Sequence, residues 1–242
     1  MEYIEFETLF CKSMQENGLP IPEKQKIDLF WQFSEHLLKV NQITNLTAIR
    51  NMPDTISKHL VDSLLCAKYL PQGARVLDIG CGAGFPSLPL AIMRSDLEIV
   101  ALDSTAKKIA FVQDSANLLA LSNLTAISGR AEDATISKKI GVFDAVVSRA
   151  VAKMSILSEL CLPYIKIGGK FVALKAAKAE EELAEAATAI KVLGGSQPII
   201  HEKELLLLDG ARERRCLIET QKERKTPSGY PRSYSLISKK PL

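Results

Sequence analysis

The chain has 242 residues, 47% of them hydrophobic, and a formal net charge of +3, so it can bury one large core. It has no apolar run of about 18 residues, as a membrane-spanning helix needs, and its acidic start is unlike a signal peptide. The five cysteines are scattered, without the spacing of zinc ligands or of a redox pair. We therefore expect a cytoplasmic protein without a metal site, and we take it to be a monomer.

Residues 1–72 are predicted to form an N-terminal helical lobe. Ile27, Phe30 and Trp31 begin a helical spacing of apolar residues that follows Pro22. A second helix is predicted over residues 53–70. It carries His59 and Asp62 one turn apart, and we expect the two side chains to form a local hydrogen-bonded pair, with a substrate contact as the alternative.

Residues 73–242 alternate between strand and helix patterns. Parallel strands are predicted at 75–79, 98–103, 124–128, 143–148 and 169–175, with helices near 86–95, 105–120, 153–164 and 177–192. Two further apolar segments, 198–208 and 215–220, flank Asp209-Gly210, which is a hairpin signal. The prediction is an α/β, Rossmann-like sheet of five parallel strands plus a terminal antiparallel hairpin. This is the layout of class I S-adenosylmethionine-dependent methyltransferases.

A glycine-rich loop follows the first predicted strand. Gly80, Gly82 and Gly84 stand at alternate positions, where a missing Cβ lets backbone approach a ligand. A dinucleotide fingerprint needs its third glycine at the position of Phe85, and the carboxylate of Asp78 would repel phosphate. We therefore predict that Asp78, Gly80 and Gly82 bind S-adenosylmethionine, which carries positive charge. An NAD-dependent oxidoreductase is the alternative.

Two later loops complete the predicted cofactor site. Asp103 ends the second strand, where an acid accepts hydrogen bonds from ribose hydroxyls in nucleotide-binding sheets. Ala131 and Glu132 follow the third strand and could place a backbone N–H and a carboxylate against the adenine. Because the carboxyl ends of parallel strands meet at one edge of a sheet, these residues are expected to face the same crevice.

Arg149 ends the fourth strand, where the methyl group would be transferred. The chain has no Asn/Asp-Pro-Pro-aromatic segment there, as amine methylation favours, and no cysteine nucleophile beside a proline. An arginine without a base suits an acceptor with no proton to lose, such as guanine N7. We predict that Arg149 is catalytic and contacts the cofactor carboxylate or the target base; the alternative is a structural salt bridge.

The C-terminal end is basic. Residues 211–242 contain nine Lys or Arg and three Glu, which predicts either a polyanionic partner or a merely solubilising tail. Tyrosines among these cations favour RNA, because aromatic rings stack on exposed bases. The predicted RNA contacts are Arg224, Lys225, Tyr230 and Arg232.

The motifs in combination resemble the bacterial 16S ribosomal RNA guanine-N7 methyltransferase family, also called the glucose-inhibited division protein B family. The resemblance covers nearly the whole chain and rests on segments 45–48, 59–64, 77–86, 102–108, 129–132, 143–150 and 226–232. It implies methylation of the guanosine at position 527 of that RNA, with naked RNA or the small ribosomal subunit as partner. It also implies cofactor contacts at Gly80, Phe85, Ala131, Glu132 and Arg149.

Overall fold

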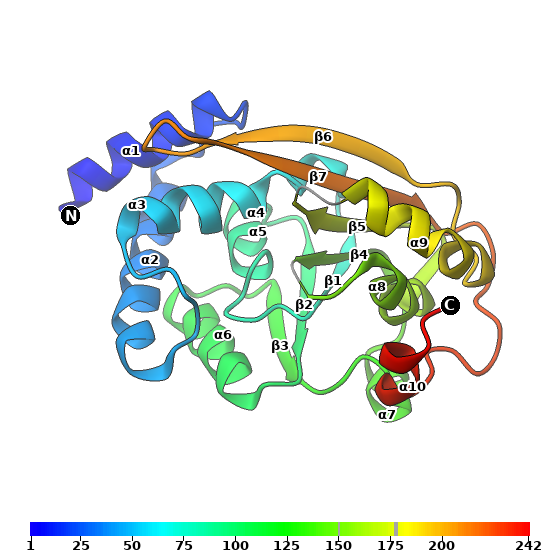
Figure 1. Cartoon of the computed structure of the whole chain (residues 1–242). Coiled ribbons are helices and arrows are strands. Elements are labelled where there is room, and N and C mark those ends of the chain that lie inside the picture. The colour runs from blue at the N-terminus through cyan, green and yellow to red at the C-terminus, as the bar shows by residue number, and fades with distance from the viewer. Residues whose placement is uncertain (150, 177–178) are drawn as a thin grey trace.

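A twisted sheet of seven strands forms the centre of the computed structural model, which describes residues 1–149, 151–176 and 179–242 (Figure 1). The strands are β1 (Arg75–Ile79), β2 (Glu98–Asp103), β3 (Leu124–Ser128), β4 (Phe143–Arg149), β5 (Ile165–Lys175), β6 (Ile199–Leu206) and β7 (Arg212–Gln221). Their order across the sheet is β3-β2-β1-β4-β5-β7-β6. The strands β1 to β5 run parallel, whereas β7 is antiparallel to β5 and β6. The predicted sheet is therefore confirmed, including its terminal hairpin.

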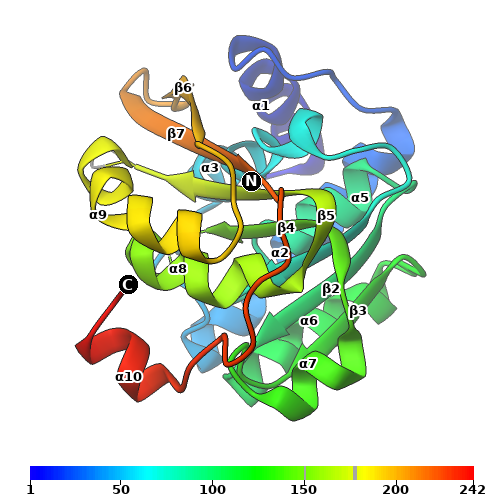
Figure 2. The ribbon, with the colours of Figure 1, turned by 90° about the vertical axis from the view of Figure 1, so that its right-hand side faces the viewer.

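Helices cover both faces of this sheet (Figure 2). They are α1 (Tyr3–Glu16), α2 (Lys24–Thr44), α3 (Met52–Asp54), α4 (Asp62–Leu64), α5 (Ser87–Met93), α6 (Ala106–Leu118), α7 (Ala134–Ile140), α8 (Met154–Cys161), α9 (Ala179–Val192) and α10 (Tyr234–Lys239). Because side chains alternate along a strand, Val76 belongs to a buried cluster that includes residues of α1 to α6, whereas Leu77 belongs to a second cluster that includes residues of α7 to α10. The sheet is thus buried on both sides, as a parallel sheet requires.

The N-terminal helices share their core with the sheet. Phe6, Phe30 and Phe33 belong to the same buried cluster as Val76 and Ile99. The side chain of Asn17 also binds the β6 backbone, donating to the Leu206 carbonyl at 3.0 Å and accepting from the Leu206 N–H at 2.8 Å. The division into residues 1–72 and 73–242 stays a prediction, but the two parts pack on one continuous core.

The segment 53–70 is helical without a break as far as Leu64, as its periodicity predicts, but it is not an α-helix throughout. It consists of α3, a π-helical stretch over Thr55–Val61, α4 and a 3-10 turn over Ala67–Tyr69. The predicted helix 153–164 likewise ends at Cys161 and continues as a 3-10 turn containing Pro163, whose missing N–H cannot extend an α-helix. The first two residues of the predicted helix 177–192 lie outside the described residues.

Candidate functional site

The glycine-rich loop joins β1 to α5 at the carboxyl edge of the sheet. The Gly80 N–H donates to the Leu102 carbonyl at 2.7 Å, and the Gly82 N–H donates to Oδ2 of Asp103 at 3.0 Å, so the loop is fixed to the end of β2. Both glycines have positive φ, at 74° and 57°. A Cβ on Gly80 would collide with the side chain of Val151, whereas a Cβ on Gly82 would project into open space. The loop therefore needs glycine for its backbone and leaves room for a ligand.

Two adjoining cavities border this loop. The larger has a volume of about 610 Å³ and the smaller of about 270 Å³, and Gly80, Asp103 and Val151 line both. The larger cavity reaches from the loop to residues of the N-terminal helices and of β7. The smaller cavity lies over the ends of β2 and β3 and includes Ala131 and Glu132. The predicted residues of these loops are thus brought together in one crevice.

Asp103 stands where the two cavities meet. Its Oδ1 accepts the Thr105 N–H at 2.8 Å and its Oδ2 accepts the Gly82 N–H at 3.0 Å. Each carboxylate oxygen has more than one lone pair, so both keep acceptor capacity toward the cavities. This placement agrees with the predicted role as a ribose-binding acid.

Asp78 lines neither cavity, unlike the nearby Gly80 and Gly82. It is fully buried and its Oδ2 accepts the Ser87 N–H at 3.1 Å and the Ser87 hydroxyl, which links β1 to the start of α5. Its other oxygen, Oδ1, has no hydrogen-bond partner among the described residues. Burial raises the pKa of this carboxyl from 3.8 to about 7. Asp78 therefore supports the loop from behind, and its direct contact with a cofactor stays a prediction.

Arg149 projects from the end of β4 into a cluster of side chains on residues 58–62 and Phe85. Its Nη1 donates to the Lys58 carbonyl at 3.0 Å and to Oδ2 of Asp62 at 3.1 Å. Its guanidinium carbon lies 5.1 Å from the centre of the Phe85 ring. The salt bridge expected as the alternative is present, and Arg149 also lines the larger cavity; its contact with the cofactor or the target base stays a prediction.

His59 is a neutral member of this cluster. Its ring lies 4.1 Å from the ring of Phe85 at an interplanar angle of 13°, and its Nε2 is 2.8 Å from Oγ1 of Thr47. Burial and the nearby Arg149 charge lower the pKa of His59 to about 3. Nη2 of Arg149 can only donate, so Nδ1 of His59 accepts at 3.1 Å and Nε2 carries the proton. Among the described residues, His59 and Asp62 bind Arg149 instead of forming the predicted local pair.

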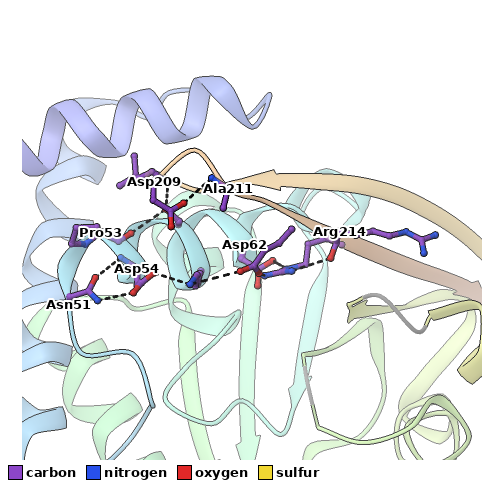
Figure 3. Close-up of polar contacts among 12 residues, drawn as sticks. Asn51, Pro53, Asp54, Asp62, Asp209, Ala211 and Arg214 are labelled. Carbon is purple, nitrogen blue, oxygen red and sulfur yellow. Dashed lines mark hydrogen bonds and ion pairs between the residues drawn. The ribbon is translucent and has the colours of Figure 1, made fainter.

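Arg215, which no local sequence pattern marks, completes this cluster from β7. Its Nε donates to Oδ1 of Asp62 at 2.7 Å, so Asp62 is held between two guanidinium groups. Glu213 pairs with Arg215 at 2.7 Å and lies 3.9 Å from the ammonium of Lys58. Figure 3 shows the polar contacts that join segment 51–62 to the β6–β7 hairpin, with Asp54 and Asp62 labelled. The cluster therefore ties three separate parts of the chain together beside the cavity.

The larger cavity is lined by more cations than carboxylates. The cations are Lys58, Lys108, Arg149, Lys175 and Arg215, and the carboxylates are Asp62, Asp103 and Glu213. The buried Tyr164 hydroxyl donates at 2.6 Å to the carbonyl of Ala131, a residue that lines the smaller cavity, and this bond fixes the loop after β3. An excess of cations in the cavity lining suits a negatively charged partner.

The predicted RNA contacts lie in a packed segment. The guanidinium of Arg232 binds Glu159, which is fully buried on α8, and Nη2 of Arg224 donates to the Lys191 carbonyl at 3.0 Å. Tyr230 is half-buried, and Lys225 is exposed. The charge of Arg232 is thus already balanced, while Lys225 faces solvent; contact of all four residues with RNA stays a prediction.

No helix in the described part of the chain combines the length and apolar character needed to cross a membrane. Within residues 1–149, 151–176 and 179–242, no group of three or more His, Cys, Asp or Glu side chains could hold a metal ion.

Comparison with known proteins agrees with this fold and loop. A protein from Clostridium beijerinckii named ribosomal RNA small subunit methyltransferase G is 40% identical over 99% of this chain and 100% of its own length. A protein of the same name from Lactobacillus johnsonii is 42% identical over 97% of this chain and 98% of its own. The crystal structure of precorrin-6y C5,15-methyltransferase from Geobacter metallireducens matches the fold with a TM-score of 0.51 at 15% identity, over 75% of this chain and 92% of that chain. Since the family described as rRNA small subunit methyltransferase G also matches residues 26–207, the chain that carries this glycine loop and arginine cluster belongs to that family.

Proposed function

We propose that this protein transfers a methyl group from S-adenosylmethionine to guanine N7 in 16S ribosomal RNA. The family and the relatives are named as methyltransferases of small-subunit rRNA, which supports the reaction class. One observation supports N7 as the acceptor: the ionisable groups around Phe85 are poorly suited to take up a proton at neutral pH. The target expected from the resemblance is the guanosine at position 527.

The residues around Arg149 bear on the choice of acceptor. His59 has a pKa of about 3, so its imidazole is a weak base. Asp62 is ion paired with both Arg149 and Arg215. Asp78 is fully buried and lines neither cavity, so its carboxyl is not placed to reach a proton on the target base. An exocyclic amine must lose a proton during methylation, whereas N7 attacks with a lone pair and needs only positioning and electrostatic support.

The residues present fit S-adenosylmethionine. Open space above Gly82 leaves room for it, and the unpartnered buried Oδ1 of Asp78 lies behind the loop, where a positively charged ligand would stabilise the ionised carboxylate. When bound, the cofactor supplies an electrophilic methyl group on a sulfonium. Asp103 would then accept hydrogen bonds from the ribose hydroxyls, and Ala131 and Glu132 would meet the adenine.

Arg149 is proposed to orient the reaction. Its guanidinium is held by Asp62 and Phe85, so its plane is fixed before a ligand enters. Because Arg149 and Phe85 both line the larger cavity, the rest of the guanidinium fork could donate to the cofactor carboxylate or to the target base. A preorganised donor of this kind lowers the barrier without taking up a proton.

The RNA partner is supported by charge. Cations line the larger cavity, and the segment that carries Arg224, Lys225, Tyr230 and Arg232 leads to Tyr234, which lines the smaller cavity. Another methylation site in RNA is the alternative that remains open to test. The family assignment leaves no support for an NAD-dependent oxidoreductase.

The test is methyl transfer to small-subunit RNA in which the target guanosine is replaced by 7-deazaguanosine. We expect transfer to the replaced position to be abolished and RNA binding to stay near normal, because only the attacking atom changes. Nucleoside mass spectrometry of unmodified substrate should find 7-methylguanosine. The chemical step should vary little between pH of about 6.5 and 8.5, where an enzyme that relies on a general base would titrate. A methylated amine or 5-methylcytidine would overturn the proposal.

A further inference from the structure

The wall of the smaller cavity includes a residue from the far end of the chain. Most of its lining comes from the ends of β1 to β4 and the loops that follow them, as the order of the strands dictates. Tyr234, the first residue of α10, also lines this cavity. Tyr234 is 41% exposed, so a residue that lines this cavity keeps part of its surface uncovered.

The segment that carries Tyr234 is held against α8. Glu159 of α8 accepts the Arg232 N–H at 2.9 Å and Nε of Arg232 at 2.7 Å, only two residues before Tyr234. Ile237 of α10 is fully buried in the layer that contains α8 and α9. Figure 2 shows the segment running from the end of β7 down past α8 to α10. Tyr234 is therefore fixed from both sides and does not sit on a loose end.

The start of the segment is fixed as well. Lys222 is almost fully buried, and its ammonium donates to the Leu162 carbonyl at 2.8 Å and to the Leu193 carbonyl at 2.7 Å. It also donates to the hydroxyl of Thr226. These contacts join the turn after β7 to the ends of α8 and α9, so the segment that leads to Tyr234 is anchored at its start.

The chemistry of the smaller cavity matches a purine nucleoside. Ile79, Leu102 and Leu160 provide apolar surface, and Asp103 and Glu132 provide carboxylates for hydroxyl and amino groups. An aromatic face is the remaining element that flat bases use, because stacking works with any purine. We propose that Tyr234 stacks on the adenine of S-adenosylmethionine and that the Glu159–Arg232 ion pair is the positioning device for it. The inference rests on the proposed function through the identity of the cofactor.

The experiment is calorimetric binding of two probes, S-adenosylhomocysteine and 5′-methylthioadenosine, to the full-length protein without RNA. Tyr234→Ala should weaken both probes equally, by about 5- to 20-fold, toward the lower part of the range for loss of base stacking. Tyr234→Phe should stay within about twofold of wild type because the ring is retained, and Tyr234→Leu should fall between the two. Leu236→Ala is the matched control, since Leu236 lies on the same short helix, is 45% exposed and is not part of the cavity lining within the described chain.

The positioning role of the ion pair has its own readout. Glu159→Gln should weaken both probes, and its effect should be largely absent in a Tyr234→Ala background, because the ion pair acts on the ligand through that ring. Equal affinity of Tyr234→Ala and wild type for both probes would overturn the inference. Additive effects of the two substitutions would remove the positioning role. Failure of wild type to bind S-adenosylhomocysteine would instead overturn the proposed function, so the two failures can be told apart.

Discussion

The substitution Glu159→Gln tests how far the C-terminal segment contributes to the stability of the whole protein. The carboxylate of Glu159 is fully buried and binds Arg232 through the backbone N–H at 2.9 Å, Nε at 2.7 Å and Nη2 at 2.5 Å. Glutamine keeps the volume of the side chain and one acceptor oxygen. Its amide nitrogen is itself a donor, so it cannot accept a hydrogen bond from the N–H groups of Arg232. The change therefore removes the charge pairing and little packing.

The structure sets the magnitude. Removing one partner of a buried ion pair costs about 3–5 kcal/mol of unfolding free energy, mostly because the other charge stays buried. The Arg232 side chain is 19% exposed, so its guanidinium can regain some water, and we expect about 3 kcal/mol. Arg232→Gln should cost more, because it leaves the carboxylate of Glu159 with no exposed surface and no cation.

Urea unfolding of the full-length protein measures these changes. At an unchanged slope of about 2–3 kcal/mol per molar, the midpoint of Glu159→Gln should fall by about 1–1.5 M. The double variant should be more stable than Arg232→Gln alone, since it buries no unpaired charge. Glu185→Gln is the matched control, because Glu185 pairs with Lys153 in the open, where the two side chains are 56% and 64% exposed, and it should change little. A midpoint for Glu159→Gln within about 0.2 M of wild type, which is less than 0.6 kcal/mol at that slope, would refute the reasoning.

Four further predictions concern the site. Burial raises the pKa of Asp78 from 3.8 to about 7, so the stability due to its bound proton is complete below pH 3.8 and is lost as pH rises to 7. Relative to wild type, Asp78→Asn should therefore gain about 2–3 kcal/mol between pH 5 and 7, and urea unfolding that finds a constant difference would contradict this. Asp103→Ala should lower cofactor affinity by about 2–3 kcal/mol in calorimetry, and unchanged affinity would exclude the ribose contact. Arg149→Ala should lower turnover about 100-fold or more in single-turnover assays, with a folded protein that still gives a cooperative melt. Replacing Arg224 and Lys225 with alanine should leave cofactor binding intact and make the salt dependence of RNA binding shallower by up to about 2 units, whereas an equal slope would mean that these charges only solvate the surface.

The sheet could be predicted because its signals are local. The apolar runs at β1, β2 and β3 end where the predicted strands end, and Asp209-Gly210 marks the turn between β6 and β7. Strand β5 begins at Ile165 instead of 169. The two glycines at 168 and 169 suggest a break, but Ile165 already pairs with Phe143 of β4 across an irregularity in the register. Helix α7 was missed, although the side chain of Asp133 caps it by accepting the Thr135 N–H at 2.8 Å, a signal that the sequence does carry.

The site could be predicted only in part, because its polar partners are distant in sequence. Gly80, Gly82 and Asp103 were found from one loop and one strand end. Arg215 was not, since it is separated from Asp62 by 153 residues and no local pattern marks it. The same holds for Glu159, which reads as one polar residue on a helix but is the buried partner of a tail arginine. Side-chain pairing across the fold decides these roles, and periodicity does not report it.

The bond between Asn17 and Leu206 has a consequence for how the chain is made. The two residues are 189 positions apart, yet the side chain of Asn17 satisfies both backbone groups of Leu206. At synthesis rates of about 5–20 residues per second, Asn17 emerges from the ribosome on the order of 10–40 s before its partner exists. The apolar side chains Phe6 and Phe10 of α1 can pack on Trp31 and Phe30 of α2 soon after synthesis. Asn17, however, stays without this backbone partner until β6 has been made, so the attachment of α1 to the edge of the sheet is among the late events of folding during synthesis.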